Sequence, residues 1–496
     1  MTRSASSRPR PAAASRWPKA SPLRVARALT AHGAIGLAIS ALLYVLCVTG
    51  SLAVFQAEWQ RWEQPAVSEF ATVSPAAAER AARAMLARDP RPTDHLYLNL
   101  PTPDIPRLVV TTDHDAWVAD ASGALVAPEA HPWTQFLLDL HYYLTLPHTA
   151  GLIVVGILGV LLLAASLSGF LAHPRIFRDA FVWRRGSGRA AEADLHNRLS
   201  VWTAPFHLPV ALTGAMLGLS TVLAIALGAA FFDGGPRAVF DPIFGAEPAG
   251  DDRPADLAAI AAPLGHMAEA HPDLTVAHVI VHDPATAGQH TAIIARHADR
   301  LIFGEYYLFD ADGRFTGTVG LADGTVGQQV AASVYQVHFG SFGGLPVKLA
   351  YGVFGVALCW IVASGMTLYF TKRARRGRPA PRLERAWTGV VWGTPGALGI
   401  TLVARLVGLT SAAGLAGLFW AALAVAVIAA VCLNARARAA RWGRVWAGGL
   451  PILAILLHAL RHGGAAAEPL ALGVSAVGVL AALATWRSLA LRPVKS

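Results

Sequence analysis

The chain has 496 residues, of which 54% are apolar and only 15% are charged, and its formal net charge is +10. Soluble domains usually have about 25% charged residues, so this composition excludes an ordinary cytosolic enzyme, and the apolar content excludes a disordered chain. The three cysteines lie within long apolar runs, which excludes a disulfide framework and a zinc cluster. The composition is that of an integral membrane protein.

Eight stretches are apolar over the roughly 20 residues that a membrane-spanning helix needs. Arg and Lys cluster before the first stretch and after the second, fourth, sixth and eighth, so every second connection is basic. Basic connections remain in the cytoplasm, so the alternation predicts eight spans in a lipid bilayer with both termini cytoplasmic. It also weighs against nucleic-acid binding by the basic runs. The predicted spans are residues 34–55, 149–172, 201–230, 347–370, 388–409, 412–433, 445–460 and 468–487.

Two long connections lie outside the cytoplasm in this topology, at residues 56–148 and 231–346. Each begins with an Ala-rich helical pattern and continues with alternating strand-like segments. Each is therefore expected to form a small helix-plus-sheet domain. The predicted helices are 75–88 and 255–270, and the predicted strands are 96–100, 107–112, 116–119, 275–282, 290–296 and 306–309.

The first ~370 residues repeat one unit, which is the first feature to seek in a sequence. The first and third spans each contain a histidine that precedes a Thr-Gly dipeptide, with 18 residues from histidine to glycine. The second and fourth spans end in a Ser-Gly dipeptide at an offset of 196 residues, and the histidines upstream of them are 197 residues apart. The repeated residues are His32 with Thr49-Gly50, His196 with Thr213-Gly214, His141 with Ser168-Gly169, and His338 with Ser364-Gly365.

Each repeat has two spans, so both copies enter the membrane in the same sense, and the repeat axis runs along the membrane normal. This symmetry predicts that His32 lies beside His196 at the cytoplasmic side and that His141 lies beside His338 at the outer side. Ionisable side chains at membrane spans are costly and usually functional. Paired imidazoles without carboxylates or thiolates do not suit zinc or a di-iron carboxylate site, whereas two imidazoles supply both axial ligands of a haem.

The pattern therefore predicts two haems, one near each membrane face, as a path for electrons across the bilayer. Two further histidines have no duplicate. His207 is 11 residues beyond His196 and so on the same helix face, where it lines a haem pocket, replaces a ligand or relays protons. His148 is a weaker candidate of the same kind.

These motifs resemble those of the PepSY-associated transmembrane-helix family, which includes bacterial iron-regulated inner-membrane proteins and ferric-siderophore reductases. The resemblance covers about residues 25–375 and rests on the order and spacing of the motifs. It implies a four-helix core that holds two b-type haems, periplasmic PepSY-like domains, and reduction of ferric chelates at the periplasmic face of the inner membrane. The motifs are Ala31-His32-Gly33, Leu140-His141-Tyr142, Leu195-His196-Asn197, Pro205-Phe206-His207 and Val337-His338-Phe339.

The expected fold is thus mainly helical and membrane-integral, with a duplicated four-helix haem-binding core, two α+β domains and a C-terminal extension of about four spans. The extension departs from the four-span pattern of the family and repeats none of the core motifs. The expected segments are a disordered basic cytoplasmic tail (1–28), the first membrane helix (29–57), PepSY-like domain 1 (58–140), the second and third membrane helices (141–230), PepSY-like domain 2 (231–337), the fourth membrane helix (338–372) and the extension (388–488).

The expected activity is that of an oxidoreductase. Electrons from a quinol or a separate reductase pass through the haems to a ferric siderophore or other ferric chelate, because the short inner loops leave no room for a flavin or nicotinamide domain. A non-enzymatic siderophore permease or accessory protein is the alternative, and a regulatory or anchoring protein is a third possibility. Side chains expected to touch an anionic chelate are Tyr142, Tyr143, Tyr335, Phe339, Phe342 and Lys348.

Overall fold

In a computed structural model of the chain, the structure describes residues 21–463, apart from 174, 182–188, 233–234, 247, 249, 299 and 434–435. Seven helices of the described part are long and apolar enough to cross a membrane. Each of the first seven predicted spans falls on one of them, and the eighth, at 468–487, lies outside the described residues. The helices are α1 (Pro22–Ala53), α5 (His148–Ala172), α8 (Ala204–Phe231), α12 (Gly344–Arg375), α13 (Pro381–Leu406), α14 (Ala412–Cys432) and α15 (Arg436–His462).

The first helix starts earlier than expected. The sequence placed residues 1–28 in a disordered tail, but α1 begins at Pro22 because Ser21 accepts a hydrogen bond from the backbone N–H of Arg24, 3.3 Å away. A serine before a proline at the first helical position is a strong start signal. The rest of the predicted tail, residues 1–20, lies outside the described part.

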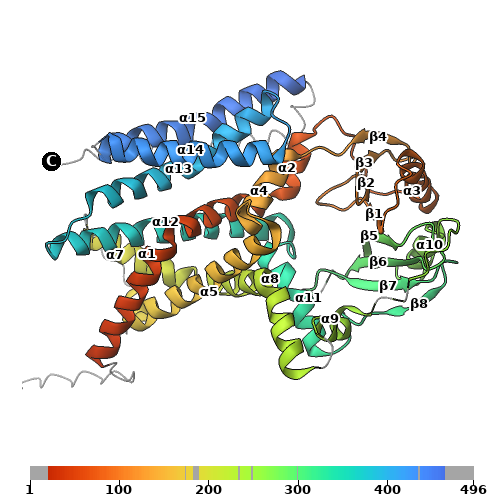
Figure 1. Ribbon diagram of the computed structural model, residues 1–496, viewed down its shortest axis with the longest axis horizontal. Coiled ribbons are helices and arrows are strands. Elements are labelled where there is room, and N and C mark those ends of the chain that lie inside the picture. The colour runs from red at the N-terminus through yellow and green to blue at the C-terminus, as the bar shows by residue number, and fades with distance from the viewer. Residues whose placement is uncertain are drawn as a thin grey trace, which may run out of the picture.

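Four of the long helices form the core predicted by the duplication. Helix α1 packs against α5 and α12, and α8 packs against α5 and, less extensively, against α12. Helices α13, α14 and α15 form a second bundle that lies along α1 on one side of this core (Figure 1). We refer to these three helices as the extension. They follow the repeated part of the chain and have no counterpart within it.

Shorter helices connect the long helices to the sheet or to one another. The sequence placed His196 in the third span, but the structure places it on a separate helix, α7, because the helical path breaks at Thr203. The break precedes Pro205, and proline has no backbone N–H for a bond to the preceding turn. The shorter helices are α2 (Gln56–Glu63), α4 (Pro132–Tyr143), α6 (Ile176–Asp179), α7 (Arg189–Trp202), α9 (Arg237–Phe244) and α11 (Val326–Phe339).

The strands of both long connections form one continuous antiparallel sheet of eight strands, at one end of the long helices (Figure 1). The strand order is β4-β3-β2-β1-β5-β6-β7-β8, so the first strand of each connection pairs with the other at the centre. The expectation of two separate domains is therefore replaced by one shared sheet. The strands are β1 (His95–Asn99), β2 (Leu108–Thr112), β3 (Ala116–Ala119), β4 (Leu125–Pro128), β5 (Thr275–His282), β6 (His290–Arg296), β7 (Glu305–Phe309) and β8 (Phe315–Thr318).

One face of this sheet is covered by α3 (Pro75–Arg88) and α10 (Ala261–Ala270), whose apolar side chains share a single core with both halves of the sheet. Helix α10 begins six residues later than the predicted 255–270. The backbone N–H groups just before it are already engaged: that of Ala258 donates to Gln289, and that of Ile260 donates to the carboxylate of Glu79 on α3. The bond from Ile260 to Glu79 joins the two halves.

A disulfide test checks the central strand pair. Tyr97 on β1 lies directly opposite Ile280 on β5, and side chains opposite each other in an antiparallel pair have Cβ atoms about 4.5–5.5 Å apart, close to disulfide range. The double variant Tyr97→Cys with Ile280→Cys is expected to form this disulfide on oxidation. It also carries Cys432→Ser, because Cys432 is exposed. Mass spectrometry of the linked peptides provides the measurement.

The matched control pairs Tyr97→Cys with Leu308→Cys on β7. Leu308 is three strand spacings from Tyr97, which is about 14 Å and too far for a disulfide. Two independent sheets would be indicated by equal cross-linking in both double variants, or by none in the first.

Candidate functional site

The structure brings the four duplicated histidines together as two facing pairs. Near the sheet, the rings of His141 and His338 have centroids 6.3 Å apart and planes 27° apart. Farther along the core, the rings of His32 and His196 have centroids 6.5 Å apart and planes 75° apart. We call these the sheet-side pair and the distal pair. Both are the pairs expected from the internal repeat.

In the sheet-side pair, each histidine lies on a short helix and contacts the backbone of a long one. The Nδ1 atom of His141 on α4 lies 3.1 Å from the carbonyl oxygen of Leu46 on α1. The Nδ1 atom of His338 on α11 lies 3.2 Å from the carbonyl oxygen of Val210 on α8. Because a carbonyl oxygen only accepts, Nδ1 carries the proton in both rings. The lone pair of each ring therefore resides on Nε2.

Threonine hydroxyls support the same two nitrogens. Thr49 Oγ1 lies 3.2 Å from Nδ1 of His141, and Thr213 Oγ1 lies 3.1 Å from Nδ1 of His338. Both threonines belong to the Thr-Gly dipeptides that mark the repeat. The two halves of the pair are thus built from equivalent residues.

The distal pair repeats the arrangement on the other two long helices. Nδ1 of His32 on α1 lies 2.8 Å from the carbonyl oxygen of Ala165 on α5. Nδ1 of His196 on α7 lies 3.0 Å from Oγ of Ser364 on α12. Fixing Nδ1 in this way sets the tautomer and the ring orientation, as it does for histidines that bind metals. All four histidines are therefore held through the same nitrogen.

A glycine lies against each imidazole. A Cβ atom added at Gly50 would lie 2.7 Å from Cε1 of His141, and one at Gly214 would lie 2.8 Å from Cε1 of His338. At Gly365 the added atom would lie 3.1 Å from His196, and at Gly169 it would lie 3.2 Å from His32. Sequence reasoning used these glycines as markers of the repeat. It did not recognise that they seat the imidazole rings.

The imidazoles on the short helices are neutral. Burial lowers the pKa of His141 to about 3, with a further contribution from His338. Burial likewise lowers the pKa of His338 and of His196 to about 4, and for His196 the neighbouring His32 adds to the effect. A neutral imidazole is the form that binds metals, so these rings are ready to coordinate.

The ring separations suit a metal ion held between two imidazoles. An atom of a five-membered ring with bonds of about 1.33 Å lies about 1.1 Å from the ring centre, and a metal–imidazole bond is about 2.0–2.1 Å. Two imidazoles on opposite sides of one ion therefore have centroids about 6.3 Å apart, as in both pairs. Within the described residues, no group of three or more His, Cys, Asp or Glu side chains is arranged to hold a metal. Each pair thus offers two ligands and no more.

The two pairs lie at different depths along α1. His32 belongs to the distal pair, whereas Leu46 and Gly50 contact His141 of the sheet-side pair. At a rise of about 1.5 Å per residue, the 14 to 18 residues between these contacts correspond to about 21–27 Å. The pairs therefore lie near opposite ends of the four-helix core.

The other two histidine candidates join neither pair. His148 begins α5 and is exposed, and its ring contacts Tyr143 at 5.3 Å between centroids. His207 is buried on α8, where its Nδ1 lies 3.2 Å from the hydroxyl of Thr203 one turn earlier. His196 and His207 are on different helices, so the expectation of one shared helix face is wrong.

Among the side chains expected to contact a ferric chelate, Lys348 is wrongly assigned. It is 5% exposed, and its Nζ lies 2.8 Å from Glu58 and 2.7 Å from Asp104. The two carboxylates neutralise the cation, which anchors α12 to α2 and to the loop before β2. Three of the five aromatic residues gather at the sheet-side pair: the ring of Phe339 stacks on that of Tyr335 and contacts that of Tyr142 edge-on. The ring of Tyr143 contacts His148 instead, and that of Phe342 contacts Tyr351.

The geometry defines a multi-pass membrane protein with two partly buried imidazole pairs in its helical core. The sequence model of the PepSY-associated TM region family matches residues 29–373, and the chain belongs to this family. The resemblance noted from the motifs is thereby confirmed. The match ends at the end of α12, so the extension lies beyond it.

A relative in Pseudomonas aeruginosa strain PAO1, named Uncharacterized protein PA4219, is 29% identical to this chain over 269 residues. The aligned region covers 49% of this chain and 64% of that protein, which is less than two thirds of its length.

Proposed function

We propose that this protein is a di-haem transmembrane ferrireductase, which passes electrons across the bilayer to a ferric siderophore or another ferric chelate for iron acquisition. The observation that carries the proposal is the presence of two facing imidazole pairs near opposite ends of one four-helix core. The family membership and the seven apolar helices support a location within a membrane.

The residues of both pairs fit axial ligation of haem b. His32 and His196 would hold one haem, and His141 and His338 would hold the other. When bound, the haems supply one-electron oxidation and reduction. The chain fixes each Nδ1 on a carbonyl or hydroxyl oxygen and so leaves Nε2 as the nitrogen that would bind the iron.

The proposed orientation places the distal pair near the cytoplasm and the sheet in the periplasm of a bacterial inner membrane, with both termini cytoplasmic. Arg175 and Arg178, which follow α5, and the basic residues that end α12 lie at the distal end of the core, as the positive-inside rule requires. The reductant on the cytoplasmic or membrane side is a quinol or a separate reductase. On the periplasmic side one electron converts Fe(III) of the chelate to Fe(II), which the hard oxygen ligands of a siderophore hold less tightly.

Spectroscopy of the purified full-length protein tests the proposal. Protein from haem-replete cells is expected to show a Soret band that shifts on reduction with dithionite, and to contain two haems per chain. Vesicles that enclose a reductant should then reduce an external ferric chelate, measured by a colorimetric Fe(II) chelator. A haem-free preparation from the same cells would contradict the proposal and favour a permease or accessory protein.

A further inference from the structure

Helix α4, which carries His141, is fastened to the extension at several points along its length. The contacts come from α13 and α14, beyond the part of the chain that the family model matches. They involve the first turn of α4, its middle and the turn that follows it. Four residues of the extension take part: Thr401, Arg405, Phe419 and Trp420.

At the first turn, Glu63 caps α4 with a carboxylate that is almost fully buried. Its oxygens accept hydrogen bonds from the backbone N–H groups of Trp133 and Thr134, at 3.1 and 2.8 Å. Negative charge is favourable at a helix N-terminus, but a buried carboxylate also needs a partner. Arg405 of α13 provides it, with Nε 2.9 Å from Glu63.

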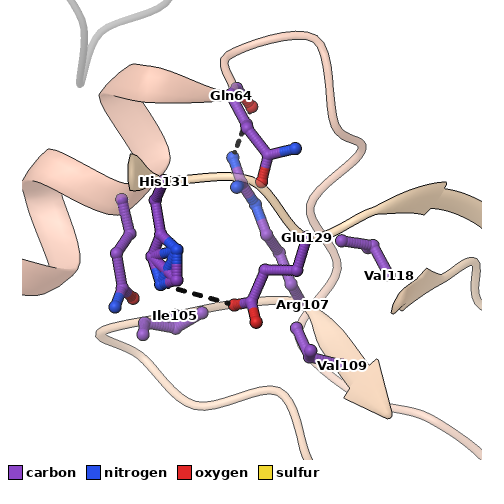
Figure 2. Close-up of a pocket in the computed structure, with 8 residues that line it drawn as sticks. Gln64, Ile105, Arg107, Val109, Val118, Glu129 and His131 are labelled. Carbon is purple, nitrogen blue, oxygen red and sulfur yellow. Dashed lines mark hydrogen bonds and ion pairs between the residues drawn. The ribbon is translucent and has the colours of Figure 1, made fainter. Parts of the chain in front are cut away.

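The same turn makes a second contact with the extension, and the residue after Glu63 contacts the loop before β2. Trp133 is buried, and its indole N–H donates to the hydroxyl of Thr401 at 3.1 Å. Gln64, the residue after Glu63, accepts a hydrogen bond on its carbonyl oxygen from buried Arg107 at 3.0 Å (Figure 2). Trp133 thus ties the start of α4 to the extension, and Gln64, at the end of α2, is tied to the loop before β2.

The middle and the far end of α4 are held by α14. The rings of Phe136 and Phe419 have centroids 5.9 Å apart. Just after α4, Leu144 and Thr145 both adopt positive φ angles of 54°, a backbone conformation that non-glycine residues rarely adopt. The indole N–H of Trp420 donates to the hydroxyl of Thr145 at 2.9 Å. This bond fastens the turn that begins three residues after His141.

Helix α11, which carries the partner His338, is capped at its start by its own residues. Thr325 and Gln328 form a capping box within the helix's first turn. The packing neighbours of α11 are α8 and α9 of the repeated part. The two ligand-bearing helices are equivalent in the duplication, yet among the described residues the extension packs against α4 and not, to any comparable extent, against α11.

We propose that Arg405 and Trp420 of the extension, together with Glu63, position α4 and through it His141, so that these contacts set the ligation of the sheet-side pair and not that of the distal pair. This inference rests on the proposed function, because it assigns a role toward the haem of that pair. Glu63, Arg405 and Trp420 are the positioning residues. None of them contacts either imidazole pair.

The test uses full-length protein and follows each haem separately, after His141→Ala and His196→Ala have assigned the two spectroscopic signals. The double variant Glu63→Gln with Arg405→Gln removes both charges together and so leaves no unpaired buried charge. We expect the haem occupancy of the sheet-side pair to fall at least threefold while that of the distal pair stays unchanged. Trp420→Phe keeps an aromatic side chain but removes the indole N–H that donates to Thr145, and should shift the midpoint potential of the sheet-side haem only.

Two matched variants serve as controls. The single variant Arg405→Lys keeps the buried positive charge and should retain most of the haem occupancy that the double variant loses. Arg382→Gln makes an arginine-to-glutamine change at the opposite, exposed end of α13 and should leave both haems unchanged.

Equal loss of both haems in the double variant would overturn the inference, because the extension would then stabilise the whole core. Unchanged spectra and potentials in the double variant and in Trp420→Phe would also overturn it, while leaving the proposed function intact. A wild-type chain that binds no haem would overturn the proposed function itself. The two failures are therefore distinguishable.

Discussion

His141→Ala is expected to purify with one haem per chain in place of two, and with the spectrum of the distal pair alone. In the proposed function, the imidazole of His141 is one of the two side chains that would hold the haem of the sheet-side pair, and its Nδ1 already contacts the carbonyl oxygen of Leu46. Alanine offers no ligand atom, and the described residues contain no cluster of ligating side chains that would replace it. The haem content of purified protein, measured against its polypeptide concentration, checks this result.

His148→Ala provides the control for the same experiment. His148 is seven residues farther along the chain, is exposed and contacts Tyr143, so its removal should leave both haems in place. Transmembrane reduction of a ferric chelate should be lost in His141→Ala and retained in His148→Ala. If His141→Ala keeps two haems with an unchanged spectrum, the assignment of the sheet-side pair is wrong.

The pairing of the histidines could be predicted because it depends on symmetry. His32 and His196 each precede a Thr-Gly dipeptide by the same number of residues, and the separation of His141 and His338 nearly equals that of the Ser-Gly dipeptides that follow them. These matching spacings identified equivalent residues without any knowledge of the packing. Two-span repeats related by an axis along the membrane normal bring equivalent residues together. His207 misled the prediction because helical periodicity was applied across Thr203, where α7 ends and α8 begins.

The shared sheet could not be predicted from the same sequence. Alternation along a strand shows which side chains share a face, but it does not specify which strand lies beside it. The strands β1 and β5 pair although about 180 residues separate them. Each of the two segments also reads as a complete small domain. Nothing local distinguishes two separate sheets from one joined at the centre.

The role of the extension was equally hidden. In the sequence, Glu63 and Arg405 are single charges more than 300 residues apart, and either reads as an ordinary charge near the end of a helix. Their importance comes from burial. The side chain of Glu63 is 1% exposed, so its negative charge needs Arg405 as a partner. A buried ion pair is a tertiary property, so it became visible only in the folded chain.

Gly50→Ala is expected to remove the sheet-side haem almost as completely as the loss of the ligand itself. The added methyl group would lie 2.7 Å from Cε1 and 3.3 Å from both ring nitrogens of His141. The ring is held against α1 by its bond to Leu46, so it must leave this position to admit the methyl group. The ring then no longer lies in its place opposite His338. The measurement is the haem content and low-spin spectrum of each pair.

Gly36→Ala on the same helix is the matched control. A Cβ atom at Gly36 meets nothing within 4 Å, and alanine is favoured over glycine within a helix by about 1 kcal/mol. This variant should therefore keep both haems and be at least as stable as the wild type. The same intrinsic gain applies at Gly50, so a loss of haem there reports the steric contact and not a weaker helix.

The other glycines extend this comparison to a graded series. The added atom would lie 2.8 Å from the ring at Gly214, 3.1 Å at Gly365 and 3.2 Å at Gly169. Repulsion rises steeply at short range, so Gly214→Ala should match Gly50→Ala, whereas the two variants at the distal pair should lose less haem. Full retention of haem by Gly50→Ala would show that the imidazole is not seated on α1 as described. A larger loss at Gly169 than at Gly50 would separate haem binding from these contacts altogether.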